Sequence, residues 1–341
     1  MNFAIVGCGV IAFTHASAIK QLPEHTLYAV CDIIPDKADA FAEKHGAKKV
    51  YYDYQDVARD PAVDIVCVCV PSGTHGEVCI AMAQAGKHIV CEKPMEITVD
   101  RIRAVQKAVE TAGVRMQCIF QRRFMPAAIA ARRAIAEGKL GKMCLAQADL
   151  RYYRDQAYYN SAGWRGTWEL DGGGALMNQG VHGVDLILWI LGEPVESLWG
   201  RAETLSRAIA VEDTAAAVLT MKSGALCTIA GATTTYPGYS TTFSLHGELG
   251  SIVFSDDGIL TWDFLNPEDA PPRPDVNESV GGAKNPFDIG ITGHVRLLDD
   301  IAQAVRDDRE PVIPPREADM AVQVITAIYE STRTGQPVRF A

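Results

Sequence analysis

The stretch "NFAIVGCGVIAFTHASAIKQLPEHTLYAVCD", residues 2–32, decides the fold. Its first five residues form a short, fully apolar run, which is typical of a central parallel strand. "GCGVIA" follows, with Gly7, Gly9 and Ala12 at G-x-G-x-x-A spacing. We then expect a helix from about Phe13 to Gln21, and a second strand, "TLYAVCD", that ends at Asp32.

The residue types in this stretch suit a dinucleotide. Gly7 permits a tight turn, Gly9 lets the backbone approach a pyrophosphate, and the small Ala12 lets helix and strand pack closely. Asp32 comes at the end of the second strand, where a carboxylate can accept hydrogen bonds from ribose hydroxyls. No arginine follows Asp32 to meet a 2′-phosphate, so NAD is favoured over NADP. A simple turn-forming role for Asp32 is the alternative.

Strands and helices keep alternating to about residue 122, which predicts a doubly wound parallel sheet, a Rossmann fold, over residues 1–122. Ligands of such sheets lie at the carboxyl ends of the strands. The residues expected to bind the cofactor are therefore Gly7, Gly9, Val10, Ile11, Ala12, Asp32, Val70, Pro71, Ser72, His75, Glu92, Lys93 and Gln121.

Residues 123–341 carry a different pattern. Alternating, strand-like runs such as "MCLAQADLRYY", "TAAAVLTM" and "ALCTIAGATTT" predict an α+β domain with one large, mostly antiparallel sheet. We expect this domain to bind the substrate and to pair subunits through the sheet, as a homodimer or homotetramer. A Pro/Gly-rich stretch, residues 266–286, predicts a loop, and helices are expected at 293–306 and 316–332.

Composition excludes several classes of protein. The formal net charge of -10 argues against general nucleic-acid binding, which relies on a basic surface. No apolar run approaches the roughly 18 residues of a membrane span. The opening residues lack a basic region and are interpreted as a strand, with no signal peptide. The nine cysteines include no C-x-x-C pair, which favours a reducing, cytoplasmic compartment and no metal site.

Arginines gather beside aromatic residues early in the second half. Residues 121–165 hold nine Lys/Arg against three acids. The substrate-binding candidates among them and their neighbours are Arg123, Tyr153, Arg154, Trp164 and Arg165. Arginine with tyrosine and tryptophan suits a sugar that carries a carboxylate or phosphate. Packing of arginine on aromatic rings for purely structural reasons is the alternative.

A glycine-led helix carries the remaining candidates. In "DGGGALMNQGVHGVDLI", residues 171–187, the spacing of four and three places Asn178, His182 and Asp185 on one helix face. We expect the glycines to let the backbone come close to substrate and cofactor. His182 has a pKa range suited to proton transfer. Asp185 either orients His182 or pairs within its own helix.

"GCGVIA", "PSGTH", "CEKP" and "GGGALMNQGVHGVD" together resemble the Gfo/Idh/MocA family of NAD(P)-dependent sugar and cyclitol oxidoreductases, over essentially the whole chain. The resemblance implies that Lys93 contacts the reacting hydroxyl and assists proton removal, with His182 as the partner acid or base. Family members commonly carry Asp four residues before that histidine; here Asn178 stands there. Asn178 can bind a sugar hydroxyl but cannot ionise.

The arginine- and tyrosine-rich segment also resembles the branch of this family that includes UDP-N-acetylglucosaminuronate 3-dehydrogenases and inositol dehydrogenase-like members. An anionic nucleotide sugar would account for the local positive charge. A non-catalytic sensor that binds NAD and sugar is the alternative function, and the presence of both Lys93 and His182 argues against it.

Overall fold

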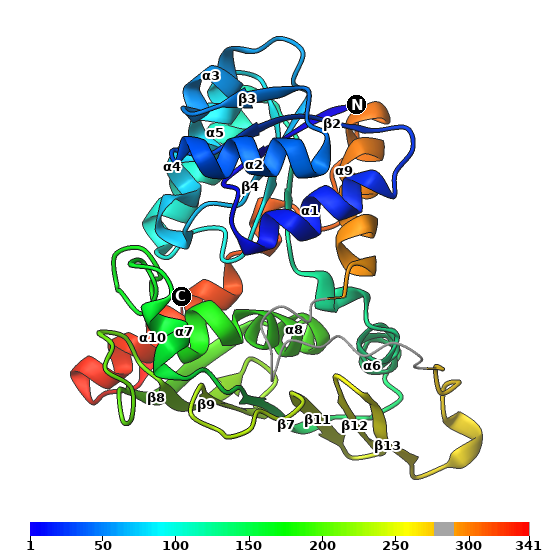
Figure 1. Ribbon diagram of the computed structural model, residues 1–341. Coiled ribbons are helices and arrows are strands. Elements are labelled where there is room, and N and C mark those ends of the chain that lie inside the picture. Colours follow the sequence, from blue (N-terminus) through cyan, green and yellow to red (C-terminus); the bar gives the residue numbers. More distant parts are fainter. Residues whose placement is uncertain (276–289, 341) are drawn as a thin grey trace. The chain divides into compact units, whose positions relative to one another are not determined.

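The computed structural model describes residues 1–275 and 290–340 and divides the chain into two compact units (Figure 1). The first comprises Met1–Gln121 and Ile291–Asp319, and the second comprises Arg122–Gly290 and Met320–Ala341. The contiguous division expected at residues 122 and 123 therefore differs from these units, because residues 291–319 return to the first unit. They do so through a helix, α9 (Thr292–Arg306), whose apolar face buries Leu297, Leu298 and Ile301.

The first unit contains a six-stranded parallel sheet in the order β3-β2-β1-β4-β5-β6, which confirms the predicted Rossmann fold. Its strands are β1 (Asn2–Val6), β2 (Thr26–Cys31), β3 (Lys49–Tyr51), β4 (Ile65–Val68), β5 (His88–Cys91) and β6 (Met116–Cys118). Its α-helices are α1 (Val10–Lys20), α2 (Pro35–His45), α3 (Tyr54–Arg59), α4 (His75–Gln84), α5 (Val99–Ala112) and α9. Short 3-10 turns lie at Ser72–Thr74 and Pro315–Glu317, and another, Gln121–Phe124, begins at the last residue of Met1–Gln121 and continues into the second unit.

The burial of β4 agrees with its central position in the sheet. Every residue of β4 is buried, as expected of a strand covered by helices on both faces. Helix α1 begins at Val10, three residues before the expected start, so Val10 and Ile11 belong to its first turn. Glycine supplies no side chain to mark a helix start, which is why the sequence placed this boundary late.

The second unit contains an eight-stranded sheet in the order β13-β12-β11-β7-β10-β9-β8-β14. Its strands are β7 (Met143–Arg151), β8 (Val195–Glu203), β9 (Thr214–Met221), β10 (Leu226–Ala232), β11 (Thr242–Gly247), β12 (Gly250–Ser255), β13 (Gly258–Phe264) and β14 (Val338–Arg339). All neighbours are antiparallel except β7 and β10, which confirms the mostly antiparallel prediction.

Helices cover one face of this sheet (Figure 1). They are α6 (Pro126–Ala136), α7 (Gln156–Asn160), α8 (Val181–Leu191) and α10 (Met320–Thr334), with a π-helical turn, η3 (Ala175–Gly180), before α8 and a 3-10 turn, η4 (Pro267–Asp269), after β13. Along β9 the residues alternate, with Ala215, Ala217 and Leu219 buried and Val218 exposed. One face of β9 therefore packs in the core of the unit, and its other face carries the exposed Val218.

Two further predictions concern the chain outside these elements. Of the predicted loop at residues 266–286, residues 276–286 lie outside the described part of the structure. Within the described part, no helix is both long enough and apolar enough to cross a membrane.

Candidate functional site

The glycine-rich turn after β1 has the geometry that a bound pyrophosphate requires. Gly7 has a φ of 95°, and a Cβ there would lie 2.6 Å from the carbonyl oxygen of Cys69. A side chain at Gly7 is thus excluded both by the backbone conformation and by close packing. A Cβ at Gly9, in contrast, would meet no atom within 4 Å. Space beside Gly9 is therefore left for a ligand.

The N-terminus of α1 can receive an anion. Gly9 is the N-cap, no side chain caps it, and the first turn holds no acidic residue. The first backbone N–H groups of a helix have no partner within the helix, and the helix dipole favours negative charge there. Val10 and Ile11 lie in this first turn, and Ala12 is fully buried beneath it.

Asp32 is held in a fixed orientation at the end of β2. Its Oδ2 accepts the backbone N–H of Cys8 at 2.9 Å, and its Oδ1 accepts the N–H of Ile34 at 2.9 Å. A carboxylate can accept about four hydrogen bonds, so capacity remains for ribose hydroxyls. The turn-forming role and the ribose-binding role of Asp32 are therefore compatible.

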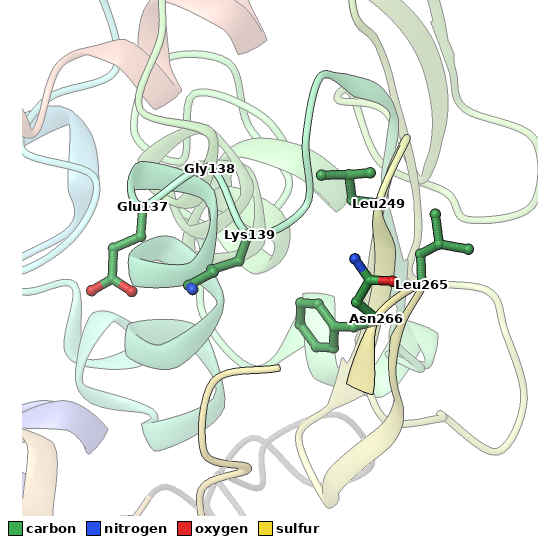
Figure 2. A pocket seen from close by; sticks show the side chains of 7 residues that line it. Glu137, Gly138, Lys139, Leu249, Leu265 and Asn266 are labelled. Carbon is green, nitrogen blue, oxygen red and sulfur yellow. The ribbon is translucent and has the colours of Figure 1, made fainter. Parts of the chain in front are cut away.

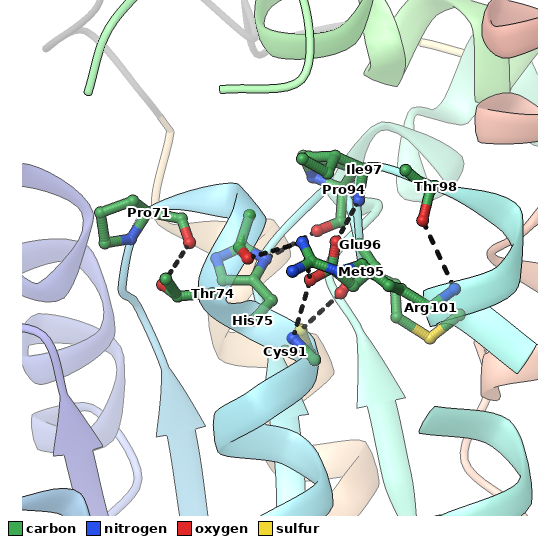
Figure 3. Close-up of polar contacts among 12 residues, drawn as sticks. Pro71, Thr74, His75, Cys91, Pro94, Met95, Glu96, Ile97, Thr98 and Arg101 are labelled. Atoms are coloured by element: carbon green, nitrogen blue, oxygen red, sulfur yellow. Dashed lines mark hydrogen bonds and ion pairs between the residues drawn. The ribbon is translucent and has the colours of Figure 1, made fainter. Parts of the chain in front are cut away.

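The segment after β4 is anchored to the segment after β5 through His75. His75 is buried, with Nδ1 2.7 Å from the carbonyl oxygen of Pro94 and Nε2 2.9 Å from that of Val70 (Figure 3). Burial lowers the pKa of His75. Pro71 begins the turn and accepts a hydrogen bond from Thr74, and Ser72 is buried beside it. His75 thus acts as a cross-link between two segments that were both predicted to bind the cofactor.

Glu92 and Gln121, both expected to bind the cofactor, differ in whether their side-chain oxygens already have partners. Glu92 is 5% exposed, and both of its carboxylate oxygens contact groups of the protein. Gln121 carries a buried side-chain oxygen, Oε1, that has no partner among the described residues. An amide donor such as a nicotinamide carboxamide would satisfy it. With the open N-terminus of α1 and Asp32, the residues of the first unit fit NAD.

In the second unit, a chain of hydrogen bonds ends on a buried carboxylate. Arg154 Nε donates to Gln179 Oε1 at 3.0 Å, and Gln179 donates to Asn178, which donates to Asp171. Asp171 is 1% exposed and also accepts the backbone N–H of Gly166 at 2.8 Å. Asp171 therefore supplies, one hydrogen bond behind Asn178, the negative charge that the resemblance led us to look for at position 178.

A tyrosine joins the predicted arginines. The guanidinium of Arg165 lies 4.2 Å from the ring centre of Tyr158 and 4.6 Å from that of Trp164, and Arg154 lies 5.5 Å from Tyr158. Burial lowers the pKa of Arg154 and raises the pKa of Tyr158. Tyr153, in contrast, packs edge-on against Tyr236, outside this group. The structure therefore brings together Arg154, Trp164, Arg165 and Asn178, with Tyr158 among them.

A second carboxylate holds the start of the helical segment that carries Asn178 and His182. Glu212 is 2% exposed and accepts the N–H groups of Gly174 at 3.0 Å and Leu176 at 2.8 Å, and the Tyr329 hydroxyl at 2.9 Å. Burial raises the pKa of Glu212, against the effect of these hydrogen bonds. A π-helical turn, a feature frequent at functional sites, begins at this cap.

The glycines of the opening "DGGG" are explained by the same contacts. A Cβ at Gly173 would lie 2.1 Å from the Tyr329 hydroxyl, and one at Gly174 would lie 2.2 Å from the carbonyl oxygen of Glu212. Close packing within the protein thus requires glycine here, without any need for an approaching ligand.

Asp185 pairs with Arg123 inside the second unit. Arg123 donates to both oxygens of Asp185, at 2.9 and 2.6 Å, and both side chains are buried. The pair is bidentate, the strong geometry of an arginine and a carboxylate. Arg123 therefore has a structural partner, and the substrate role predicted for it remains a prediction. His182, one turn before Asp185, is half-buried.

A shallow hollow of about 230 Å³ lies in the second unit, away from these residues (Figure 2). Its lining comprises Glu137, Gly138, Lys139, Leu249, Phe264, Leu265 and Asn266. None of the predicted site residues lines it.

Four residues of this arrangement were missed by sequence reasoning: Tyr158, Asp171, Gln179 and Glu212. Asp171 and Gln179 lie inside the glycine-led stretch, and Tyr158 inside "YYRDQAYY", so inspection of their neighbours could have suggested them. The only signal for Glu212 is the acidic pair of "VEDTA", directly before β9.

Two family descriptions match the chain. Residues 1–120 match "Oxidoreductase family, NAD-binding Rossmann fold", and residues 128–253 match "GFO/IDH/MocA C-terminal domain". Similar proteins include a myo-inositol 2-dehydrogenase of Thermotoga maritima, 30% identical over 75% of each chain. A scyllo-inositol 2-dehydrogenase (NAD(+)) of Bacillus subtilis is 26% identical over 98% of this chain and 95% of its own.

A solved structure is similar over the full length. It is the WlbA dehydrogenase of Bordetella pertussis in complex with NADH and UDP-GlcNAcA, with a TM-score of 0.89 and 33% identity. The similarity covers 100% of this chain and 98% of that one.

Proposed function

The chain belongs to the Gfo/Idh/MocA family of NAD-binding oxidoreductases, and from that premise we propose that it oxidises a nucleotide-sugar uronate. Its enzyme class is that of an NAD-dependent dehydrogenase acting on a secondary alcohol, because its relatives are dehydrogenases of sugars, cyclitols and nucleotide sugars. The observation that carries the finer proposal is the full-length similarity to a dehydrogenase that binds UDP-GlcNAcA.

The arginines of the second unit support an anionic substrate. Arg165 is half-buried, and its guanidinium lies against Tyr158 and Trp164. A guanidinium already packed on aromatic rings loses little further freedom when it binds a carboxylate or phosphate. Arg154 provides a second positive charge in the same group. A neutral polyol would leave both charges without a function in binding.

NAD, when bound, accepts the hydride from the carbon that carries the hydroxyl. The N-terminus of α1 and the space beside Gly9 would hold its pyrophosphate, and Asp32 would accept hydrogen bonds from a ribose. Val70, Pro71, Ser72 and His75 form the adjoining strand-end segment, and Gln121 offers an acceptor for the carboxamide. Those assignments remain proposals for the residues concerned.

Lys93 and His182 are proposed to handle the hydroxyl proton. A neutral amine on Lys93 would take the proton as hydride leaves, and His182 would exchange it with solvent. Asn178 is proposed to bind a neighbouring hydroxyl of the substrate. Its amide donates to Asp171 and accepts from Gln179, and these two hydrogen bonds orient the side chain.

A substrate panel tests the proposal. UDP-N-acetylglucosaminuronate, its uncharged counterpart UDP-N-acetylglucosamine, glucuronate and myo-inositol would be supplied with NAD and with NADP, and NADH or NADPH formation followed. We expect the uronate to be preferred over its uncharged counterpart, with NAD. Turnover of neutral polyols alone would eliminate the anionic substrate.

A pair of variants refines the same test. Arg165→Ala should raise the KM for the uronate more than the KM for any neutral substrate. Arg201→Ala is the matched control, because Arg201 lies in the same unit but is exposed and paired with Glu203. Equal effects of the two variants would contradict a role for Arg165 in binding the acid.

We propose further that the chain forms a homodimer or homotetramer through the second sheet. Trp199 of β8 pairs in register with Val218 of β9, and both are nearly half exposed, at 48% and 45%. Leu226 of β10 is 46% exposed. Such residues support a face that is covered in an assembly. Val218→Glu should convert the oligomer to a monomer in light scattering; an unchanged mass would refute this interface.

A cytoplasmic location is proposed from the cysteines. All nine are thiols, and only Cys144 is exposed, which suits a reducing compartment.

A further inference from the structure

Two histidines and one glutamate form a buried cluster, and the glutamate is the residue directly before Lys93 in the sequence. His15 comes from α1, Glu92 follows β5, and His294 comes from α9; their exposed fractions are 0%, 5% and 0%. His15 Nε2 lies 2.8 Å and His294 Nε2 3.4 Å from the same oxygen, Glu92 Oε1. The sequence reasoning assigned no role to either histidine.

The second oxygen of Glu92 reaches the neighbouring residue. Glu92 Oε2 accepts the backbone N–H of Lys93 at 3.2 Å. Glu92 N donates to the carbonyl of Val68 at 3.1 Å, and His75 contacts the carbonyl of Pro94 at 2.7 Å. The backbone on both sides of Lys93 is therefore hydrogen-bonded to buried groups. The Glu92 carboxylate makes the hydrogen bond to Lys93 itself.

The cluster keeps Glu92 ionised. Burial by itself would raise the pKa of Glu92, but the hydrogen bond with His15 and the electrostatic effect of His15 and His294 outweigh burial and hold the pKa well below its usual range. Burial lowers the pKa of His15. Nδ1 of His15 and both ring nitrogens of His294 have no hydrogen-bond partner among the described residues, so a proton on His15 Nδ1 would be unsatisfied. The His15 ring is therefore best accommodated as a neutral donor through Nε2.

The cysteine thiols near Glu92 carry no charge that would oppose the carboxylate. The thiols of Cys67 and Cys69 on β4 and of Cys91 on β5 interact electrostatically with Glu92, and burial raises the pKa of each well above neutrality. Burial also lowers the pKa of His75, whose ring contacts the carbonyl oxygens of Val70 and Pro94. A negative charge thus remains on Glu92, adjacent to Lys93.

A metal ion is a second interpretation of two histidines and a glutamate, which are common zinc ligands. The separation of 2.8 Å between His15 Nε2 and Glu92 Oε1 is that of a hydrogen bond. Two ligands of one tetrahedral zinc ion, each about 2.0–2.1 Å from the metal, would lie about 3.3 Å apart. The observed distance therefore assigns a hydrogen bond to the pair of His15 and Glu92.

We propose that Glu92, held as a carboxylate by His15 and His294, is a positioning residue that fixes the backbone at Lys93 and carries a negative charge on the residue directly before it. This inference rests on the proposed function, in which Lys93 takes the hydroxyl proton. The charge would stabilise the protonated amine, and so set the pH above which Lys93 acts as a base.

The variants Glu92→Gln and His294→Gln test this role. Glu92→Gln removes the charge at nearly constant volume and turns an amide N–H toward the Lys93 N–H or the histidines. We expect kcat to fall by about 10- to 100-fold, as for a small misplacement of a reacting group, while NAD affinity measured by titration changes little. The rising limb of the kcat–pH profile should move to lower pH, because loss of the charge lowers the pKa of the Lys93 amine.

His294→Gln, a milder change, retains a donor and keeps the measurement possible if Glu92→Gln fails to fold. We expect it to move the pH profile in the same direction, by less. His88→Gln is the matched control: His88 lies at the opposite end of β5, where its Nδ1 accepts the Arg115 N–H at 2.9 Å. That variant should leave the pH profile unchanged.

The outcomes separate this inference from the proposed function. If Lys93→Ala abolishes turnover but Glu92→Gln and His294→Gln keep the wild-type kcat and pH profile, the positioning role is wrong and the proposed function stands. If Lys93→Ala turns over normally, the proposed function is wrong. Stoichiometric metal in the purified protein that is lost in Glu92→Gln would also overturn the inference.

Discussion

The substitution Glu212→Ala should loosen the start of the segment that carries Asn178 and His182. Glu212 accepts hydrogen bonds from the N–H groups of Gly174 and Leu176 and from the Tyr329 hydroxyl. A buried donor left without an acceptor costs about 1–3 kcal/mol, so leaving all three donors without their acceptor should cost about 3–5 kcal/mol after partial entry of water. Glu212→Gln keeps one acceptor oxygen and should cost about 1–2 kcal/mol.

Hydrogen exchange of the segment measures this cost locally. About 3 kcal/mol corresponds to exchange of the Gly174 and Leu176 amides that is roughly 100-fold faster, when exchange occurs by local opening. Glu193→Gln is the control, because Glu193 also accepts two hydrogen bonds, from Ser223, but in an exposed position. Unchanged exchange of the segment in Glu212→Ala would refute the capping role.

The pH dependence adds a second criterion. Since burial raises the pKa of Glu212 in the folded state, its contribution to stability is fully present below the unfolded value of 4.5 and is lost as the pH rises through the folded value. The difference in thermal midpoint between wild type and Glu212→Gln should therefore be largest at low pH and become smaller as the pH rises. A difference that grows with pH would indicate a carboxylate stabilised in its ionised form.

Three further substitutions test other contacts. Asp32→Ala should weaken NAD binding by about 10- to 100-fold, the value of one or two charge-assisted hydrogen bonds, and unchanged affinity in an NAD titration would exclude the ribose contact. Asp171→Asn should lower kcat/KM without changing NAD affinity, because it removes the charge behind Asn178 and replaces one of the two acceptor oxygens by an amide donor; equal kinetics would show that Asp171 does not fix Asn178. Asp185→Asn should cost about 3–5 kcal/mol by leaving Arg123 buried without its carboxylate, and calorimetry that finds no shift in melting would contradict this.

Strand alternation and glycine spacing predicted the fold well, because each reflects the backbone geometry of a few neighbouring residues. The alternation of "TAAAVLTM" coincides with β9, Thr214–Met221, since each residue must face either core or surface. The G-x-G-x-x-A spacing identified Gly7, whose positive φ and proximity to Cys69 no other residue tolerates well. Both features depend mainly on a few neighbouring residues.

Contacts between distant parts of the chain could not be predicted in this way. The amphipathic pattern of α9 predicts a helix but not which core it joins, so its return to the first unit, and His294 beside Glu92, were missed. Glu212 lies 38 residues from Gly174, and only the folded chain brings them together. Asp185 was predicted to act on its own helix face, but a buried arginine was its stronger partner.

The central claim is that this chain transfers hydride to NAD with Lys93 as the group that takes the hydroxyl proton. A single-turnover experiment with excess enzyme, NAD and UDP-N-acetylglucosaminuronate tests it most directly, with wild type and Lys93→Ala compared at equal occupancy by NAD. We expect NADH to form in the wild type and not in Lys93→Ala, with NAD affinity nearly unchanged. NADH formation at the wild-type rate in Lys93→Ala would contradict the claim.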